Sequence, residues 1–79
     1  MINNIHIKFF GRLVDLTQTE SCTLEDVTDL NDVITKIQEQ YPAIKNSTYS
    51  VALDKVITTQ NVRLREGQTV AFMPPYSGG

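Results

Sequence analysis

The residues of this 79-residue chain that are best suited to chemistry lie at its carboxyl end. In order they are Pro74, Pro75, Tyr76, Ser77, Gly78 and Gly79. Consecutive prolines favour an extended backbone, and two glycines add no side chains. We therefore predict a thin stalk, which reaches on the order of 18 Å at about 3.1 Å per extended residue. Such a stalk fits a channel that is too narrow for larger side chains.

The candidate reactive group of this stalk is the terminal carboxylate of Gly79. A carboxylate is ionised at neutral pH and is a poor electrophile, so acyl chemistry requires that another enzyme activate it, most simply as an adenylate formed with ATP. A sulfur nucleophile could then displace the nucleotide and leave a thiocarboxylate, or an amine could displace it and form an amide. Neither Gly78 nor Gly79 has a Cβ to crowd the reacting carbonyl. A frayed, chemically inert end is the alternative interpretation.

No second reactive constellation is visible in the sequence. The one histidine, His6, stands at an outward position of a predicted strand, where a surface residue is expected. The one cysteine, Cys22, has no partner for a disulfide and no histidine nearby, so a small core residue is the simplest interpretation. The acidic residues between positions 25 and 32 surround a predicted helix start, where they stabilise the helix dipole. We expect no metal and no bound cofactor; ATP is used only by the activating enzyme.

Composition and charge narrow the class of protein. The chain is long enough for one domain with one small core. Its hydrophobic fraction of 41% and charged fraction of 20% are typical of a globular protein. A net charge of −2 provides no basic surface for nucleic acid or for an anionic membrane. No apolar run is long enough for a membrane span and no leader opens the chain, so a soluble, cytoplasmic protein is predicted.

Hydrophobic periodicity predicts the order of the secondary-structure elements. Strands are expected at 2–10, 20–24, 49–53, 56–57 and 69–73, with one or two helical turns over 11–18 and a longer helix over 29–41. The long helix has a cap supplied by Thr28 or Asp29, and Pro42 ends it. Its apolar stripe consists of Leu30, Val33, Ile34, Ile37 and Tyr41.

The strands and one irregular segment, residues 61–65, supply the rest of the core. The inward-facing residues are expected to be Ile5, Ile7, Phe9, Val51, Leu53, Val62, Leu64, Val70 and Phe72. Turns are predicted at Asp54-Lys55 and around Gly67. One amphipathic helix covers one face of a mixed sheet, which predicts a two-layer α+β fold of the β-grasp, or ubiquitin-like, type over residues 1–73. Residues 74–79 form a flexible tail that leaves the last strand.

Alternation in the first and last strands places Phe10 and Met73 on the face opposite the core. An exposed aromatic ring is unusual at such a position. Phe10 either packs under the segment that follows it or belongs to a surface patch that binds a partner.

The two ends of the chain resemble those of the small, sulfur-carrier subunit of molybdopterin synthase, a ubiquitin-like family of molybdenum cofactor biosynthesis. The resemblance covers essentially the whole chain and is most specific over residues 8–13, Lys-Phe-Phe-Gly-Arg-Leu, and over residues 67–79. Gly11 stands where the family usually has alanine, Arg12 keeps a basic position, and Val14 replaces a second one that is common. The closing Pro-Pro-x-x-Gly-Gly is intact.

This resemblance implies a function for the tail. An adenylating, ubiquitin-activating-like enzyme would activate Gly79, which would become a thiocarboxylate. The tail would then enter the active site of the large subunit of molybdopterin synthase, in a heterotetramer, and donate sulfur to cyclic pyranopterin monophosphate to build the dithiolene. The resemblance also implies that the large subunit supplies the general acid–base groups and the pterin pocket, so that none of that chemistry lies on this chain. Phe10, Met73 and Tyr76 are the candidate docking contacts.

Three alternatives remain open from the sequence. A sulfur carrier for thiamine thiazole synthesis resembles the chain in fold and in its Gly-Gly end, but tends to lack the spacer formed by Pro74 and Pro75. A ubiquitin-like protein modifier would instead join Gly79 to a lysine. A plain β-grasp interaction module would have an inert tail.

Overall fold

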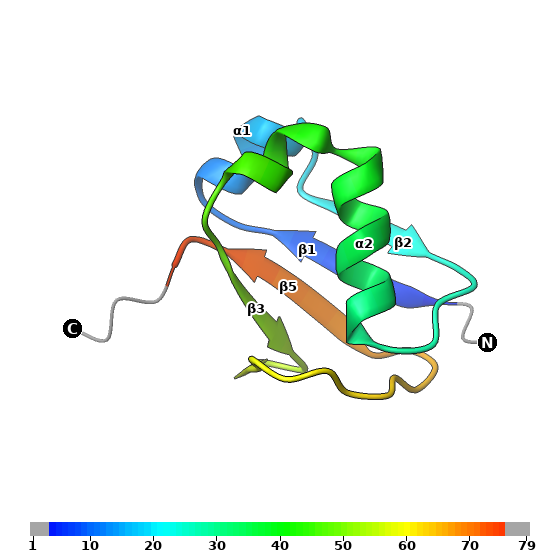
Figure 1. Ribbon diagram of the computed structural model, residues 1–79. Helices are drawn as coiled ribbons and strands as arrows, with labels where there is room; N and C mark the ends of the chain where they lie inside the picture. The colour runs from blue at the N-terminus through cyan, green and yellow to red at the C-terminus, as the bar shows by residue number, and fades with distance from the viewer. Residues whose placement is uncertain (1–3, 76–79) are drawn as a thin grey trace.

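The computed structural model describes residues 4–75, which form a mixed five-stranded sheet with helices packed on one face (Figure 1). The elements are β1 (Ile5–Phe9), α1 (Arg12–Thr17), β2 (Ser21–Leu24), α2 (Leu30–Gln40), the 3₁₀ helix η1 (Pro42–Asn46), β3 (Ser50–Leu53), β4 (Val56–Ile57) and β5 (Thr69–Met73). The predicted order of strands and helices is confirmed, and η1 is an addition that the sequence pattern did not reveal.

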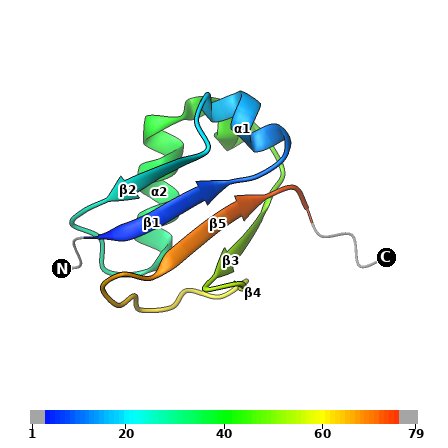
Figure 2. The same cartoon turned by 180° about the vertical axis from the view of Figure 1, so that it is seen from behind.

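The sheet has the strand order β2-β1-β5-β3-β4, with the first and last strands side by side at its centre (Figure 2). Strands β1 and β5 run parallel, with Phe9 opposite Phe72, whereas all other neighbours run antiparallel. A mixed sheet of this order wrapped around one main helix is the ubiquitin-like β-grasp, as the sequence predicted.

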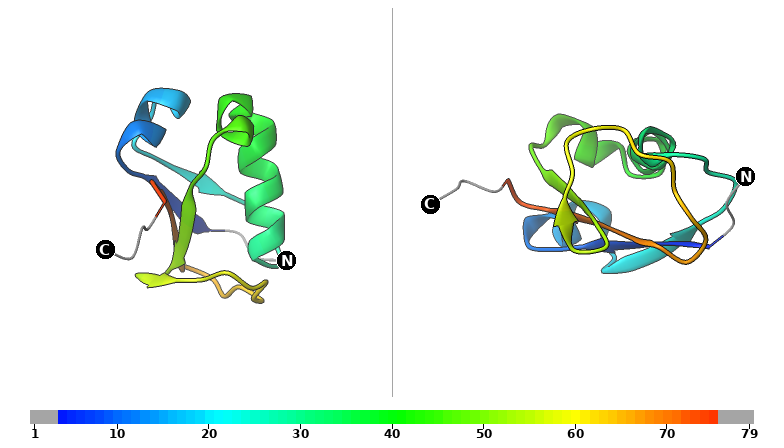
Figure 3. Two further views of the ribbon diagram at one scale, coloured as in Figure 1. Left: turned by 60° about the vertical axis from the view of Figure 1, so that its left-hand side comes forward. Right: turned by 90° about the horizontal axis from the view of Figure 1, so that it is seen from below.

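Helix α2 crosses one face of the sheet and leaves the other face without a helix (Figures 2 and 3). The short α1 and η1 lie beyond one end of the strands, on the same side as α2 (Figure 1). The molecule therefore has two layers, with the core between them and an outer sheet face opposite. We use the term outer face for this helix-free side of the sheet.

The N-terminus of α2 is capped by Asp29, one of the two residues expected there. Its Oδ1 accepts a hydrogen bond of 2.9 Å from the backbone N–H of Asp32, while Oδ2 of Asp32 accepts one of 2.9 Å from the N–H of Thr28. The side-chain amide of Asn61 donates to Asp29 at 3.1 Å. The hydrogen bond from Asn61 has the largest effect on the pKa of Asp29, and the one from the N–H of Asp32 adds to it. Both lower this pKa because they favour the ionised carboxylate.

The core fills the space between α2 and the sheet. Its buried residues are Ile5, Ile7, Phe9, Leu13, Leu24, Val27, Leu30, Val33, Ile37, Ile44, Val51, Leu64, Val70 and Phe72. At one end it is aromatic, because the ring of Phe9 lies 5.5 Å from that of Tyr41 and 5.7 Å from that of Phe72, centroid to centroid. The first and last strands are thus joined by ring packing as well as by backbone hydrogen bonds.

Two sequence-based details are wrong or shifted. Val62 was expected in the core but is 38% exposed, because its backbone rather than its side chain holds the segment: its carbonyl accepts from the N–H of Leu30 at 2.9 Å. Within the described residues the first strand runs from Ile5 to Phe9, so Phe10 lies just beyond it. Residues 2 and 3 of the predicted strand lie outside the described range.

Among residues 4–75, no helix is both long and apolar enough to cross a membrane. Nor does this described part of the chain bring three or more His, Cys, Asp or Glu side chains together in a way that could hold a metal ion.

Candidate functional site

The two central strands end side by side, and this brings together residues from opposite ends of the chain. The backbone N–H of Phe10 donates to the carbonyl of Phe72 at 3.0 Å, one step beyond the last paired residues of β1 and β5. Since side chains alternate along a strand, Phe10 and Met73 both fall on the outer face. Two of the three predicted docking residues, Phe10 and Met73, are therefore neighbours in space.

Pro74 ends the parallel ladder at this point. The alternation of hydrogen bonds along β1 would next require the N–H of residue 74 to donate to the carbonyl of Phe10. Proline has no N–H, and the Phe10 carbonyl accepts instead from the N–H of Leu13 at 3.2 Å. The chain consequently leaves the sheet at Pro74, directly after β5.

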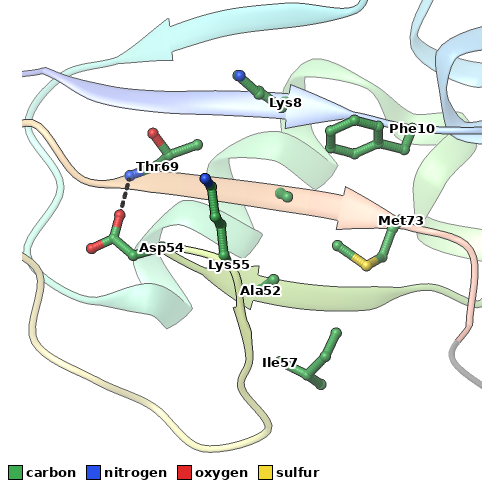
Figure 4. Close-up of a pocket in the computed structure, with 9 residues that line it drawn as sticks. Lys8, Phe10, Ala52, Asp54, Lys55, Ile57, Thr69 and Met73 are labelled. Atoms are coloured by element: carbon green, nitrogen blue, oxygen red, sulfur yellow. Dashed lines mark hydrogen bonds between the residues drawn. The ribbon is translucent and has the colours of Figure 1, made fainter.

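The outer face holds a shallow cavity of about 490 Å³ (Figure 4). Its lining residues come from β1 and the residue after it, from β5 and from the β3–β4 hairpin: Lys8, Phe10, Ala52, Asp54, Lys55, Ile57, Thr69, Ala71 and Met73. Ala52 and Ala71 are directly paired across β3 and β5, so two small side chains form its floor. Phe10 is 47% exposed, so its ring is not packed under the segment that follows, and its role in binding a partner stays a prediction.

The outer face combines apolar side chains with two positively charged groups. Lys8 and Lys55 are both exposed there. The carboxylate of Asp54 accepts from the backbone N–H of Thr69 at 3.0 Å and from the side-chain amide of Gln68 at 2.9 Å. Both hydrogen bonds lower the pKa of Asp54, and the one from Thr69 has the larger effect. The carboxylate is thus engaged within the fold, whereas both ammonium groups lie at the surface.

Cys22 has the surroundings of a structural residue. It is half-buried against the core, where desolvation raises the pKa of its thiol although a hydrogen bond with Tyr41 opposes this effect. A raised pKa keeps the thiol protonated at neutral pH and lowers its nucleophilicity. The interpretation of Cys22 as a small packing residue agrees with this environment.

The structure places some of the predicted site residues and leaves others outside the described range. Pro74 and Pro75 are exposed and follow β5. The remaining tail residues, Tyr76, Ser77, Gly78 and Gly79, lie outside the described residues, so their roles stay predictions.

Sequence reasoning missed the contribution of the β3–β4 hairpin to the outer face. Ala52, Lys55 and Ile57 line the cavity beside Met73. A signal was present, because alternation placed Val51 and Leu53 inward and hence Ala52 outward. The pairing of Ala52 with Ala71 depends on the register of β3 and β5, which local sequence does not reveal.

Comparison with known proteins agrees with this arrangement. The model of the ThiS family matches residues 7–79, which is nearly the whole chain. The chain belongs to the ThiS family. A curated relative of this ThiS-family chain is the molybdopterin synthase sulfur carrier subunit of Mycobacterium tuberculosis, 26% identical over 95% of this chain and 96% of the relative.

Solved structures show that the ThiS-family chain shares its fold with proteins of low sequence identity. A putative molybdopterin converting factor, subunit 1, from Pyrococcus furiosus superposes with a TM-score of 0.86 at 17% identity, over 94% of this chain and 99% of that one. Subunit 1 in the complex of subunits 1 and 2 of the molybdopterin-converting factor from Helicobacter pylori gives 0.74 at 23%, over 96% and 99%. The small archaeal modifier protein 1 of H. volcanii gives 0.80 at 14%, over 94% and 99%.

Proposed function

We propose that this chain is the sulfur-carrier subunit of a molybdopterin synthase. The main supporting observation is that β5, at the centre of the sheet, ends beside an exposed apolar face. The Pro-Pro-Tyr-Ser-Gly-Gly sequence follows this strand directly. The name of the mycobacterial relative supports the same assignment. In this proposal the domain is a rigid handle, and the reacting group is the carboxyl of Gly79.

The proposed chemistry proceeds in three steps. A carboxylate oxygen of Gly79 attacks the α-phosphorus of ATP on an activating enzyme, which releases pyrophosphate and forms an acyl adenylate. A sulfide-level nucleophile then adds to the acyl carbon and expels AMP, leaving a thiocarboxylate. Finally the thiocarboxylate sulfur attacks a carbon of cyclic pyranopterin monophosphate and displaces an oxygen substituent from it. Water then hydrolyses the resulting thioester, which leaves the sulfur on the pterin and returns the Gly79 carboxylate.

The large subunit is the proposed partner for the last step. Subunit 1 of the H. pylori factor has this fold and was solved as a complex with subunit 2. On this chain the apolar surface of Phe10 and Met73 lies next to the point where the tail leaves the sheet. A partner that covers this face would receive the tail at its edge. General acid and base groups would come from that partner.

Intact-mass spectrometry tests the proposal. The protein is incubated with an activating enzyme, ATP and a sulfur donor, and we expect exchange of one oxygen for sulfur, localised to Gly79 by fragmentation. The matched control lacks Gly79 and should gain no sulfur. Failure of the full chain to gain sulfur, under conditions that convert a known carrier, would contradict the proposal. A carboxyl-terminal tag should also abolish sulfur transfer, because it turns the Gly79 carboxylate into an amide.

A protein modifier is the second candidate, favoured by the likeness in fold to the small archaeal modifier protein. An amine in place of sulfur would convert the same adenylate into an isopeptide bond. Conjugates that survive reducing agent on denaturing gels, and that disappear when Gly79 is deleted, would support this function. Sulfur exchange without such conjugates would exclude it under the conditions tested.

Genetic complementation separates the two sulfur pathways. We expect the chain to restore molybdoenzyme activity to cells that lack the small subunit of molybdopterin synthase. Rescue of thiamine auxotrophy alone, in cells that lack the thiazole sulfur carrier, would transfer the assignment to thiazole synthesis. The spacer formed by Pro74 and Pro75 favours the first result.

A further inference from the structure

Gly11 lies against the base of the tail, and in this backbone conformation the contact with Pro74 leaves no room for a Cβ. It connects β1 to α1 with φ of 59° and ψ of −138°. A Cβ built on Gly11 would lie 2.7 Å from Cγ and 3.2 Å from Cδ of Pro74. Carbon atoms in favourable contact are about 3.5–4.0 Å apart, so a methyl group here would overlap the proline ring.

Two separate constraints therefore apply to the same residue. The positive φ with extended ψ belongs to a region that glycine enters readily and that a Cβ disfavours. The contact with Pro74 is independent of that backbone preference. Gly67 provides the comparison, because its φ is also positive, at 83°, yet a Cβ there would meet no atom within 4 Å.

The contact matters because, within residues 4–75, β5 has no backbone hydrogen bond to β1 beyond this point, and on its other side its pairing with β3 ends at Met73, opposite Ser50. The last hydrogen bond that ties the two strands here joins the N–H of Phe10 to the carbonyl of Phe72. Pro74 cannot extend the ladder, and the carbonyl of Phe10 is already paired with the N–H of Leu13. The ring of Pro74 instead rests on the bare Cα of Gly11, where the chain turns away from the sheet.

We propose that Gly11 is a positioning residue for the tail. The absence of its side chain creates the seat for Pro74, and this seat sets the direction in which the chain leaves β5. The inference rests on the proposed function for its consequence: Gly11 acts through Pro74 on the presentation of Gly79, without touching the reacting atoms. Displacement of a reacting group by about 1 Å can cost on the order of a hundredfold in rate.

The test compares four variants with the wild-type protein: Gly11→Ala, Gly67→Ala, Pro74→Ala and the double variant Gly11→Ala/Pro74→Ala. Each is prepared with a preformed thiocarboxylate on Gly79, so that activation does not limit the rate. The single-turnover rate of sulfur transfer is measured at saturating large subunit, and affinity for that subunit is measured separately. Thermal unfolding gives the folded fraction of each variant.

We expect Gly11→Ala to lower the saturated rate by about tenfold to a hundredfold and to change affinity less. Gly67→Ala also places a Cβ on a residue with positive φ, but without a neighbouring atom within 4 Å, and should keep the wild-type rate. In the Pro74→Ala background, where the obstructing ring atoms are gone, Gly11→Ala should cost no more than about twofold. Equal losses for Gly11→Ala and Gly67→Ala, or an undiminished loss in the Pro74→Ala background, would overturn the inference.

A second measurement is independent of sulfur transfer. NMR cross-peaks between the Hα atoms of Gly11 and the ring protons of Pro74 should be present in the wild-type protein. One-bond Cα–Hα dipolar couplings of Pro74 and Pro75 should change in Gly11→Ala and not in Gly67→Ala. Unchanged couplings in Gly11→Ala would overturn the inference. Wild-type protein that transfers no sulfur would instead contradict the proposed function, and the couplings would still decide the role of Gly11.

Discussion

The turn between β3 and β4 places two side-chain-bearing residues in a conformation that glycine prefers. Asp54 has φ of 47° and Lys55 has φ of 73°. Positive φ at both positions of a two-residue hairpin loop defines a type I′ turn, for which Asp-Gly is among the most favoured sequences. The hairpin carries Ile57 and Lys55 to the outer face, so its geometry bears directly on the docking surface.

Replacement of Lys55 by glycine should therefore stabilise the protein. We expect a gain of about 0.5–1 kcal/mol in the free energy of unfolding, because relief of the left-handed strain exceeds the added entropy of the unfolded chain. Urea denaturation at neutral pH measures it. Lys55→Ala removes the same charge and keeps the strain, so it should change stability little. A gain of the same size in Lys55→Ala would assign the effect to the charge.

The carboxylates of Asp29 and Asp54 should make stability depend on pH in the acid range. Hydrogen bonds lower both pKa values in the folded state, so the unfolded chain binds protons more readily as the pH falls. The stabilisation is present above the ordinary carboxyl pKa of about 4 and is lost as the pH falls through the lowered folded values. Acid should therefore weaken the cap of α2 and the contact between Asp54 and β5.

Substitution by the neutral amide checks this expectation. Asp29→Asn and Asp54→Asn should each be less stable than wild type at pH 7, and the difference should shrink near pH 2. Urea midpoints at the two pH values measure it. Glu39→Gln changes the charge at an exposed position of α2 and serves as the control. A difference that stays constant with pH would show that the charge of the carboxylate is not the cause.

At the scale of elements, α2 packs on the sheet through an apolar stripe that the spacing of its residues in the sequence predicted. Leu30, Val33 and Ile37 are buried, and Ile34 and Tyr41 pack against the core from its margin. The helix itself runs over Leu30–Gln40, so the predicted ends at 29 and 41 are its caps. Burial of one face over three turns explains why a helix of this length is stable in the protein.

Removal of one methylene from this stripe should lower the free energy of unfolding. Ile37 is fully buried, and we expect Ile37→Val to cost about 0.5–1.5 kcal/mol, because it removes buried hydrocarbon and leaves a small void. Chemical denaturation measures the change. Thr35→Ala, on the exposed side of the same helix, should stay within about 0.5 kcal/mol of wild type. A negligible effect at Ile37 would mean that neighbouring side chains close the void.

At the scale of the whole molecule, the outer face and the tail form one proposed functional unit. Phe10→Ala and Met73→Ala should each weaken binding of the large subunit on the order of tenfold, because apolar anchors near the centre of an interface dominate affinity. Calorimetric titration measures this. Val62→Ala changes an exposed apolar residue outside the cavity and is the matched control.

Folding must be separated from docking in that experiment. Phe10 is exposed, so its replacement should leave the unfolding temperature nearly unchanged. Loss of binding with an intact fold would support the docking role, whereas wild-type affinity in both variants would exclude the outer face as the contact surface.

The sequence alone was sufficient for the properties that depend on neighbouring residues. Alternation in residues 5–9 and 69–73 predicted which side chains are buried, and the apolar stripe predicted α2. The two prolines and two glycines of residues 74–79 singled out the tail. Such patterns are local, because backbone geometry repeats every two residues in a strand and every 3.6 in a helix.

Only the tertiary structure decided the properties that join distant segments. The parallel pairing of β1 with β5 places Phe10 beside Met73, and the register of β3 sets Ala52 against Ala71. The same pairing brings Pro74 against Gly11. From the sequence alone, Gly11 is indistinguishable from an ordinary turn glycine. Strand partners and registers follow from packing of the complete core, so no local pattern contains them.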